Sequence, residues 1–137
     1  MRKCVALFLF GLLCACAVKP SATHQLAESE WAFVRIDDEP PASKAATLRF
    51  TQDALLASAG CNRMDGDWRI ENGRLIAGPM EMTEIGCLDA ALFDQERALA
   101  SLLVAAPQFE LKEGRLLLQS RGHSAELRRI NPPPQSS

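Results

Sequence analysis

The chain has 137 residues, of which 47% are apolar and 23% charged, a composition that favours one folded globular domain. Its formal net charge of -2 excludes the broad basic surface of a nucleic-acid-binding protein. Two histidines and no tyrosine leave few side chains for general acid–base catalysis or for a zinc site. We therefore expect a protein that is not an enzyme, has no cofactor or metal, and binds no nucleic acid.

Residues 1–15 are typical of a secretory signal peptide. Arg2 and Lys3 precede an apolar run that ends before Lys19 and is shorter than the roughly 20 residues of a membrane-spanning helix. The run ends in Leu13-Cys14-Ala15-Cys16, which resembles the lipobox of bacterial lipoproteins. The sequence therefore predicts lipidation at Cys16. The alternative is a soluble secreted protein that is cleaved nearby.

Lipidation would place several fatty-acyl chains, such as palmitate, on Cys16. Each buried methylene contributes roughly 0.8 kcal/mol, so several chains would hold the protein firmly on a membrane. Ala17 follows Cys16 in place of Asp, which resembles the sorting pattern of outer-membrane lipoproteins that face the periplasm. Loss of residues 1–15 would leave 13 basic and 17 acidic side chains. This acidic excess argues against binding to an anionic membrane surface through charge.

Cys61 and Cys87 would be the remaining cysteines, an even pair in an oxidising compartment. A disulfide between them would close a loop of about 27 residues and stabilise the fold by roughly 3.5 kcal/mol. The alternative is two buried free thiols. The 26-residue separation differs from the Cys-x-x-Cys spacing of redox centres, so we interpret a bond here as structural.

The expected organisation has four parts. Residues 16–28 are polar without apolar periodicity and are interpreted as a lipidated tether. Residues 29–131 form the domain, and residues 132–137 are a Pro/Ser tail that we expect to be disordered.

Most of the domain has the pattern of short strands. Asn72-Gly73 and Glu113-Gly114 each separate two apolar runs and predict hairpins. The residues from 88 to 104 follow a helical period instead, with Leu88, Leu92, Leu99 and Leu103 on one stripe. Asp94, Glu96 and Arg97 are interpreted as lying off that stripe, and Pro107 ends the helix. The expected strands are 31–36, 47–51, 54–59, 68–70, 74–76, 109–112, 116–119 and 125–130.

This order predicts an α+β fold: a small antiparallel, partly open β-barrel or sheet of about eight short strands, packed by one α-helix. The helix must bury its leucine stripe against the sheet. We expect a monomer.

Two motifs resemble those of a known family. Gly60-Cys61-Asn62-Arg63 followed by Gly66 is similar to the first signature of the META domain, or HslJ-like, family. Thr83 and Cys87 match its second signature, Thr-x-Met-Ala-Cys, although Ile85 and Gly86 depart from it. The resemblance covers about residues 29–130. It implies a bacterial envelope protein, often a lipoprotein, linked to the stress response, with a barrel like that of secretin pilots and no established catalytic residues.

Structural roles are sufficient to explain the motif residues. Gly60 is expected to adopt a backbone conformation that other residues avoid, and Asn62 is expected to adopt left-handed geometry or to hydrogen-bond nearby backbone. Asp65-Gly66-Asp67 resembles a calcium loop, but Cys61 would occupy its first ligand position, so a polar turn is favoured. His123 is expected to be solvated.

An apolar surplus leaves two interpretations open. Consecutive leucines at 116–118 and alternating methionines could fill both sides of a central strand. They could instead line a groove for a hydrophobic or peptide ligand, between the helix and the sheet. The residues expected to bind that ligand are Met80, Met82, Leu92 and Leu117. The second function class is a scaffold that inhibits or pilots one envelope protein through its loops, such as residues 37–44 or 62–67.

Overall fold

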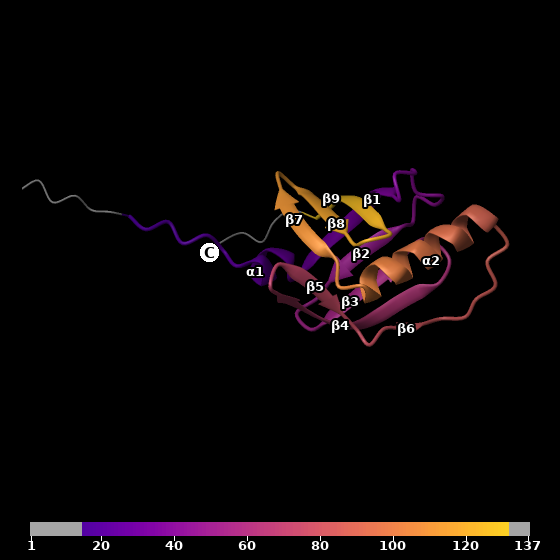
Figure 1. Cartoon of the computed structure of the whole chain (residues 1–137), viewed down its shortest axis with the longest axis horizontal. Coiled ribbons are helices and arrows are strands. Elements are labelled where there is room, and N and C mark those ends of the chain that lie inside the picture. The colour runs from indigo at the N-terminus through magenta and orange to yellow at the C-terminus, as the bar shows by residue number, and fades with distance from the viewer. Residues whose placement is uncertain (1–14, 132–137) are drawn as a thin grey trace, which may run out of the picture.

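The structure, a computed structural model, describes residues 15–131. The predicted tail and all but the last residue of the predicted signal peptide lie outside this range. The described residues form a short helix, a long helix and nine strands (Figure 1). These are α1 (Ala22–Leu26), β1 (Ser29–Ile36), β2 (Thr47–Phe50), β3 (Ala54–Ser58), β4 (Arg63–Glu71), β5 (Arg74–Ala77), β6 (Glu81–Met82), α2 (Ala90–Val104), β7 (Gln108–Lys112), β8 (Arg115–Gln119) and β9 (Ser124–Arg129).

Eight of the strands close into an antiparallel barrel. The strand order is β3-β2-β1-β9-β8-β7-β5-β4, and pairing between β3 and β4 completes the ring. The ring is weakest between β5 and β7, where Arg74 and Gln108 are the one pair in register. β6 is an extra strand that pairs with β4 beyond the end of β5. The expected fold class, a partly open antiparallel barrel packed by one substantial helix, is confirmed.

The barrel interior holds one apolar core. Alternate residues of each strand point inward, so β8 buries Leu116 and Leu118 and exposes Leu117. Phe50 and Trp68 meet edge to face, with ring centroids 4.9 Å apart. Of the two interpretations of the leucine triplet, the one with two buried faces is wrong, because the outer face of β8 is open to solvent.

Helix α2 begins later than its apolar pattern suggests. The Asp89 side chain caps it by accepting hydrogen bonds from the backbone N–H groups of Ala91 (2.9 Å) and Leu92 (3.2 Å). Leu88 therefore precedes the helix and is fully exposed, which corrects its placement on the stripe. Leu99, Leu102 and Leu103 form the buried face. In the described part of the chain, neither helix has the length and apolar character needed to cross a membrane.

Part of the predicted tether is folded. α1 is capped by Ser21 and places Leu26, which is completely buried, against the core. Ser29 fixes this contact: its hydroxyl donates to the Leu26 carbonyl and accepts from Trp31 Nε1 at 2.7 Å. The folded region thus starts before residue 29. A single buried leucine carries no periodicity, so the sequence pattern did not reveal it.

The expected polar turn at Asp65-Gly66-Asp67 is wrong, because these residues lie inside β4. Alternation along β4 keeps both aspartates exposed while Met64 and Trp68 point inward. Gly66 is required there by a crossing segment. A Cβ at residue 66 would lie 2.6 Å from the Pro79 carbonyl oxygen and 2.8 Å from Met80 Sδ.

Candidate functional site

The two signature motifs meet around one buried side chain, Asn62. Its Oδ1 accepts hydrogen bonds from the Thr83 hydroxyl (2.9 Å) and the Ile85 backbone N–H (2.6 Å). Its Nδ2 donates to the Ile85 carbonyl (3.1 Å) and to Glu96 Oε1 (2.8 Å). All four hydrogen-bonding positions of the amide are therefore used. Asn62 acts through these bonds and not through left-handed geometry, since its φ is not positive.

Glu96 completes this cluster and was missed by the sequence pattern. It is 4% exposed, and its Oε2 accepts a second hydrogen bond, from the Asn62 backbone N–H at 2.8 Å. The interpretation that Glu96 lies off the buried stripe of α2 is wrong. Residue 96 lies four positions after Leu92 and three before Leu99, so helical spacing places it on the same face as these leucines. That spacing could have predicted the burial of Glu96.

The structure joins Cys61 and Cys87 by a disulfide, with Cα atoms 6.1 Å apart. The bond ties the β3–β4 connection to the segment that leads into α2, beside Asn62. The two sulfurs and a Glu96 carboxylate oxygen lie within 4.8 Å of one another. Such a group could ligate a cation only after reduction, because the thiolate is the sulfur ligand that metals use. In the bonded state the cluster is a structural crosslink.

Gly60 has the unusual backbone conformation that the sequence predicts for it. Its φ is +123°, and an added Cβ would collide with the Ser43 side chain. Arg63, the next motif residue after Asn62, is exposed at the start of β4. Its backbone pairs with Thr83, donating to Thr83 Oγ1 at 3.0 Å and accepting from Thr83 N–H at 3.0 Å. The motif residues thus hold the β6 segment and α2 against β4.

An apolar groove lies between β6 and the C-terminal half of α2. It has a volume of about 170 Å³. The methionines come from β4 and the β6 segment, and the remaining residues come from α2. The lining residues are Met64, Met80, Met82, Ala100, Leu103 and Val104. Met82 and Val104, exposed by 48% and 67%, form its open rim.

Two of the four predicted ligand residues lie elsewhere. Leu92 is half-buried near the other end of α2, where its Cδ1 faces Gly60. Leu117 is on the outer face of β8. The structure therefore brings together Met80 and Met82, because both belong to the segment paired with β4, and separates Leu92 and Leu117 from them.

The two loops expected to engage a partner are less free than predicted. Residues 62–67 are largely β4 and not a loop. The loop at residues 37–44 is fastened to α2 by Gln95, whose side chain accepts from Ala42 N–H (2.7 Å) and donates to the Pro40 carbonyl (2.8 Å). His123 lies on the same side, with Nδ1 2.7 Å from Asp37 Oδ2, and its side chain is 33% exposed, so this contact is a surface one and the expected access to solvent holds.

Comparison with known proteins agrees with this architecture. The heat shock protein HslJ of Escherichia coli (strain K12) is 25% identical over 124 residues, which cover 86% of this chain and 89% of HslJ. A protein solved by NMR superposes with a TM-score of 0.70 at 20% identity, covering 80% of this chain and 95% of its own. Another, from Burkholderia xenovorans, gives 0.64 at 21% identity, with 85% and 94% covered.

A family model matches most of the chain. The META domain family model matches residues 24–131, which include α1 residues as well as the barrel. This range agrees with a folded region that begins before residue 29. The chain therefore belongs to the META domain family.

Proposed function

We propose that this protein is a lipid-anchored periplasmic binding module without catalytic activity, serving the stress response or maintenance of the envelope. The lipobox-like Leu13-Cys14-Ala15-Cys16 supports the anchor and an outer-membrane location. The principal polar cluster supports a non-catalytic role, because Asn62 and Glu96 are buried and their polar groups are occupied by hydrogen bonds to each other and to residues 83–85. The membrane would be one partner, and a peptide segment of an envelope protein the other.

The apolar groove is the observation that carries the binding role. Its volume of about 170 Å³ is below the roughly 300–1,000 Å³ of pockets that enclose drug-sized ligands. A groove of this size suits one or two apolar side chains better than a whole acyl chain. Methionines on three of its lining positions give it an adaptable surface.

β6 supplies a backbone edge for the same ligand. It is the last strand in the sheet order and, in the described part of the chain, pairs on one side with β4. Thr83 N–H donates to the Arg63 carbonyl, so alternation along the strand directs the Met82 N–H away from β4. An extended peptide could add to this edge and place an apolar side chain between Met82 and Val104.

The first experiment is native mass spectrometry on full-length protein extracted gently from its own envelope. We expect a bound peptide or protein on the wild type. Met82→Lys should lose this partner while its melting temperature stays unchanged, because Met82 is on the groove rim and not in the core. Leu117→Lys is the matched control, since Leu117 is 40% exposed on a distant strand face, and it should keep the partner.

Hydrogen exchange tests the mode of binding. The Met82 amide should exchange slowly in the complex and quickly in the free protein, because strand addition would give it an acceptor. A co-purifying acyl molecule in place of a peptide, or equal loss of partner from both lysine variants, would contradict the proposed site. A bare wild-type monomer would reject the binding role.

A further inference from the structure

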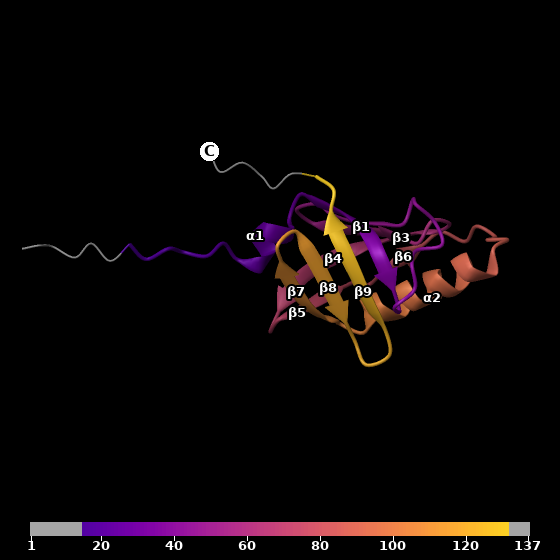
Figure 2. The same ribbon diagram turned by 90° about the horizontal axis from the view of Figure 1, so that it is seen from above.

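A second pocket lies at the opposite end of the barrel from the α2 N-terminus. It has a volume of about 530 Å³ and is enclosed by α1, the residues before it, the tip of the β7–β8 hairpin and the end of β9. In both ribbon views, α1 and the incoming chain lie beside this hairpin (Figures 1 and 2). Five of its lining residues are lysine, arginine or histidine, and we call this site the cationic pocket: Lys19, His24, Lys112, Arg115 and Arg129.

Acidic side chains do not balance these charges. Glu113 is the one carboxylate that lines the pocket. Arg115 forms an ion pair with Glu126, so its charge does not add to the unbalanced positive charge of the pocket. Lys112 and Arg129 have no ion-pair partner among residues 15–131. The local positive excess contrasts with the acidic chain as a whole.

Arg129 is the most confined of these cations. Its guanidinium stacks on the Trp31 ring, 5.6 Å from the ring centroid, while Nε donates to the Asn131 carbonyl at 3.0 Å. Its Nη2 is shielded from solvent and has no hydrogen-bond acceptor among the described residues. Burial lowers the pKa of this guanidinium, which remains charged. A partly buried cation with a shielded, unbonded N–H group and no carboxylate partner is stabilised by an anion nearby.

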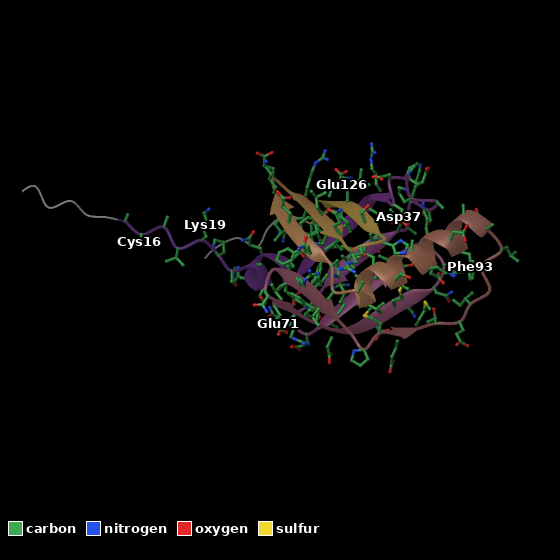
Figure 3. All side chains as sticks on the ribbon, viewed as in Figure 1. Cys16, Lys19, Asp37, Glu71, Phe93 and Glu126 are labelled. Atoms are coloured by element: carbon green, nitrogen blue, oxygen red, sulfur yellow. A yellow bond between two sulfur atoms is a disulfide. The ribbon has the colours of Figure 1, made fainter. Side chains whose placement is uncertain are left out.

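We propose that the cationic pocket binds a phosphate group, such as that of an anionic phospholipid headgroup. Guanidinium and ammonium groups are the usual protein ligands of phosphate. Lys19 lines the pocket and is three residues from Cys16, a reach of at most about 11 Å. Figure 3 shows Cys16 and Lys19 on the same side of the barrel, remote from Phe93. The proposal that a lipid headgroup supplies the phosphate rests on the proposed lipidation of Cys16. The proposal of a phosphate site does not depend on that lipidation.

The two tryptophans allow a direct test. Trp31 lies under Arg129, whereas Trp68 is bonded through Nε1 to the Thr51 carbonyl at another part of the barrel. Full-length protein labelled with [15N]Trp, in maltoside micelles that carry no phosphate, should give two indole signals. We would titrate it with inorganic phosphate, with phosphatidylglycerol added to the micelles, and with sodium chloride at matched ionic strength. The Trp31 signal should move with a phosphate-bearing probe, while the Trp68 signal stays in place.

Substitutions then test the pocket. Arg129→Gln should weaken the response about tenfold or more, as expected for loss of a charged hydrogen-bonding group. Lys112→Gln should weaken it about two- to fivefold, the loss expected for one exposed charge. Lys112→Gln is the safer variant because Lys112 is exposed, whereas Arg129 also packs on Trp31. Arg128→Gln is the matched control on the exposed face of β9 and should respond like the wild type.

The outcomes separate the two sources of phosphate. Movement with phosphatidylglycerol but not with inorganic phosphate assigns the site to a headgroup. Movement with both at comparable concentrations assigns it to phosphate in general. Three results would overturn the proposal. The Trp31 signal could respond equally to sodium chloride, it could respond to neither phosphate probe, or its response could be unchanged in both pocket variants. Micelles supply the lipid here without acylation of Cys16, so failure of the anchor would not affect this result.

Discussion

At the scale of single residues, the site around Asn62 is held together by polar groups that hydrogen-bond one another. Asn62 holds the segment at residues 83–85 and the Glu96 carboxylate at the same time. A buried carboxylate is tolerated when hydrogen-bond donors replace the water it has lost, and Asn62 supplies two donors to Glu96, its backbone N–H and its Nδ2. The cluster is therefore a support for the fold around the disulfide.

Asn62→Ala should lower the free energy of unfolding by about 3 kcal/mol, because it removes one donor from the buried Glu96 carboxylate and both side-chain bonds to the part-buried Ile85 backbone. Urea unfolding measures this loss. Adding Glu96→Leu to Asn62→Ala should restore part of the stability, since removing both partners leaves fewer unsatisfied groups. A loss below about 1 kcal/mol for Asn62→Ala would show that water replaces the amide.

Gly66→Ala should be destabilising by about 1–3 kcal/mol, the range for overpacking a close contact. The reason is the approach of the Pro79 carbonyl, which a Cβ would meet at 2.6 Å. Gly86→Ala is the control, because no described atom lies within 4 Å of its added Cβ. Thermal unfolding compares the two variants. Equal melting temperatures would mean that the segment at residues 79–80 can move aside without cost.

At the scale of elements, the short helix α1 packs against the barrel and belongs to the folded domain. Leu26 is buried, and Arg129 Nη1 donates to the Gln25 carbonyl at 3.4 Å. Asn131 connects the same region to β1, donating to the Glu28 carbonyl and accepting from Glu30 N–H. The two ends of the domain therefore fasten each other, which fixes where the chain leaves toward Cys16.

Leu26→Ala should cost about 2–5 kcal/mol of unfolding free energy, as expected for truncating a fully buried leucine. Leu88→Ala should change it by less than about 0.5 kcal/mol, because Leu88 is exposed ahead of α2. Denaturant titration of both variants checks the comparison. If Leu26→Ala behaved like Leu88→Ala, α1 would contribute nothing to the stability of the barrel.

At the scale of the whole molecule, the barrel presents two different ends. The cationic pocket lies at the end of the barrel from which the chain extends toward Cys16, whereas Phe93 lies at the far end (Figure 3). An overall acidic chain argued against charge-driven membrane binding, but net charge averages over surfaces and does not report a local cluster. The proposed anchor and the proposed phosphate site would act on the same side of the protein.

Cys16→Ser should release the protein from the membrane fraction, because acyl transfer needs the thiol. Intact mass spectrometry should find the mass of several acyl chains on the wild type and none on the variant. Cys14→Ser keeps a small residue at the middle lipobox position and should remain anchored. Membrane association that persists in Cys16→Ser, with no added mass, would reject the lipoprotein assignment.

Local patterns in the sequence were enough to predict most of the secondary structure and the family. Alternation located most of the strands but missed β6 and the start of β4. Asn72-Gly73 and Glu113-Gly114 located two hairpins, and the leucine period located α2 to within two residues. The two signature motifs identified the family. Each of these signals lies within a few neighbouring residues, where backbone preference and side-chain alternation act directly.

Contacts between residues that are distant in the sequence depend on the folded arrangement of the barrel. Glu96 is buried because the β3–β4 connection brings Asn62 to it, 34 residues away in sequence. Met80 and Met82 share a groove with α2, while Leu117 faces solvent, because strand register and sheet closure set which face each residue presents. The cationic pocket likewise unites Lys19 with Arg129. Such contacts depend on how the barrel closes, and no local period contains that information.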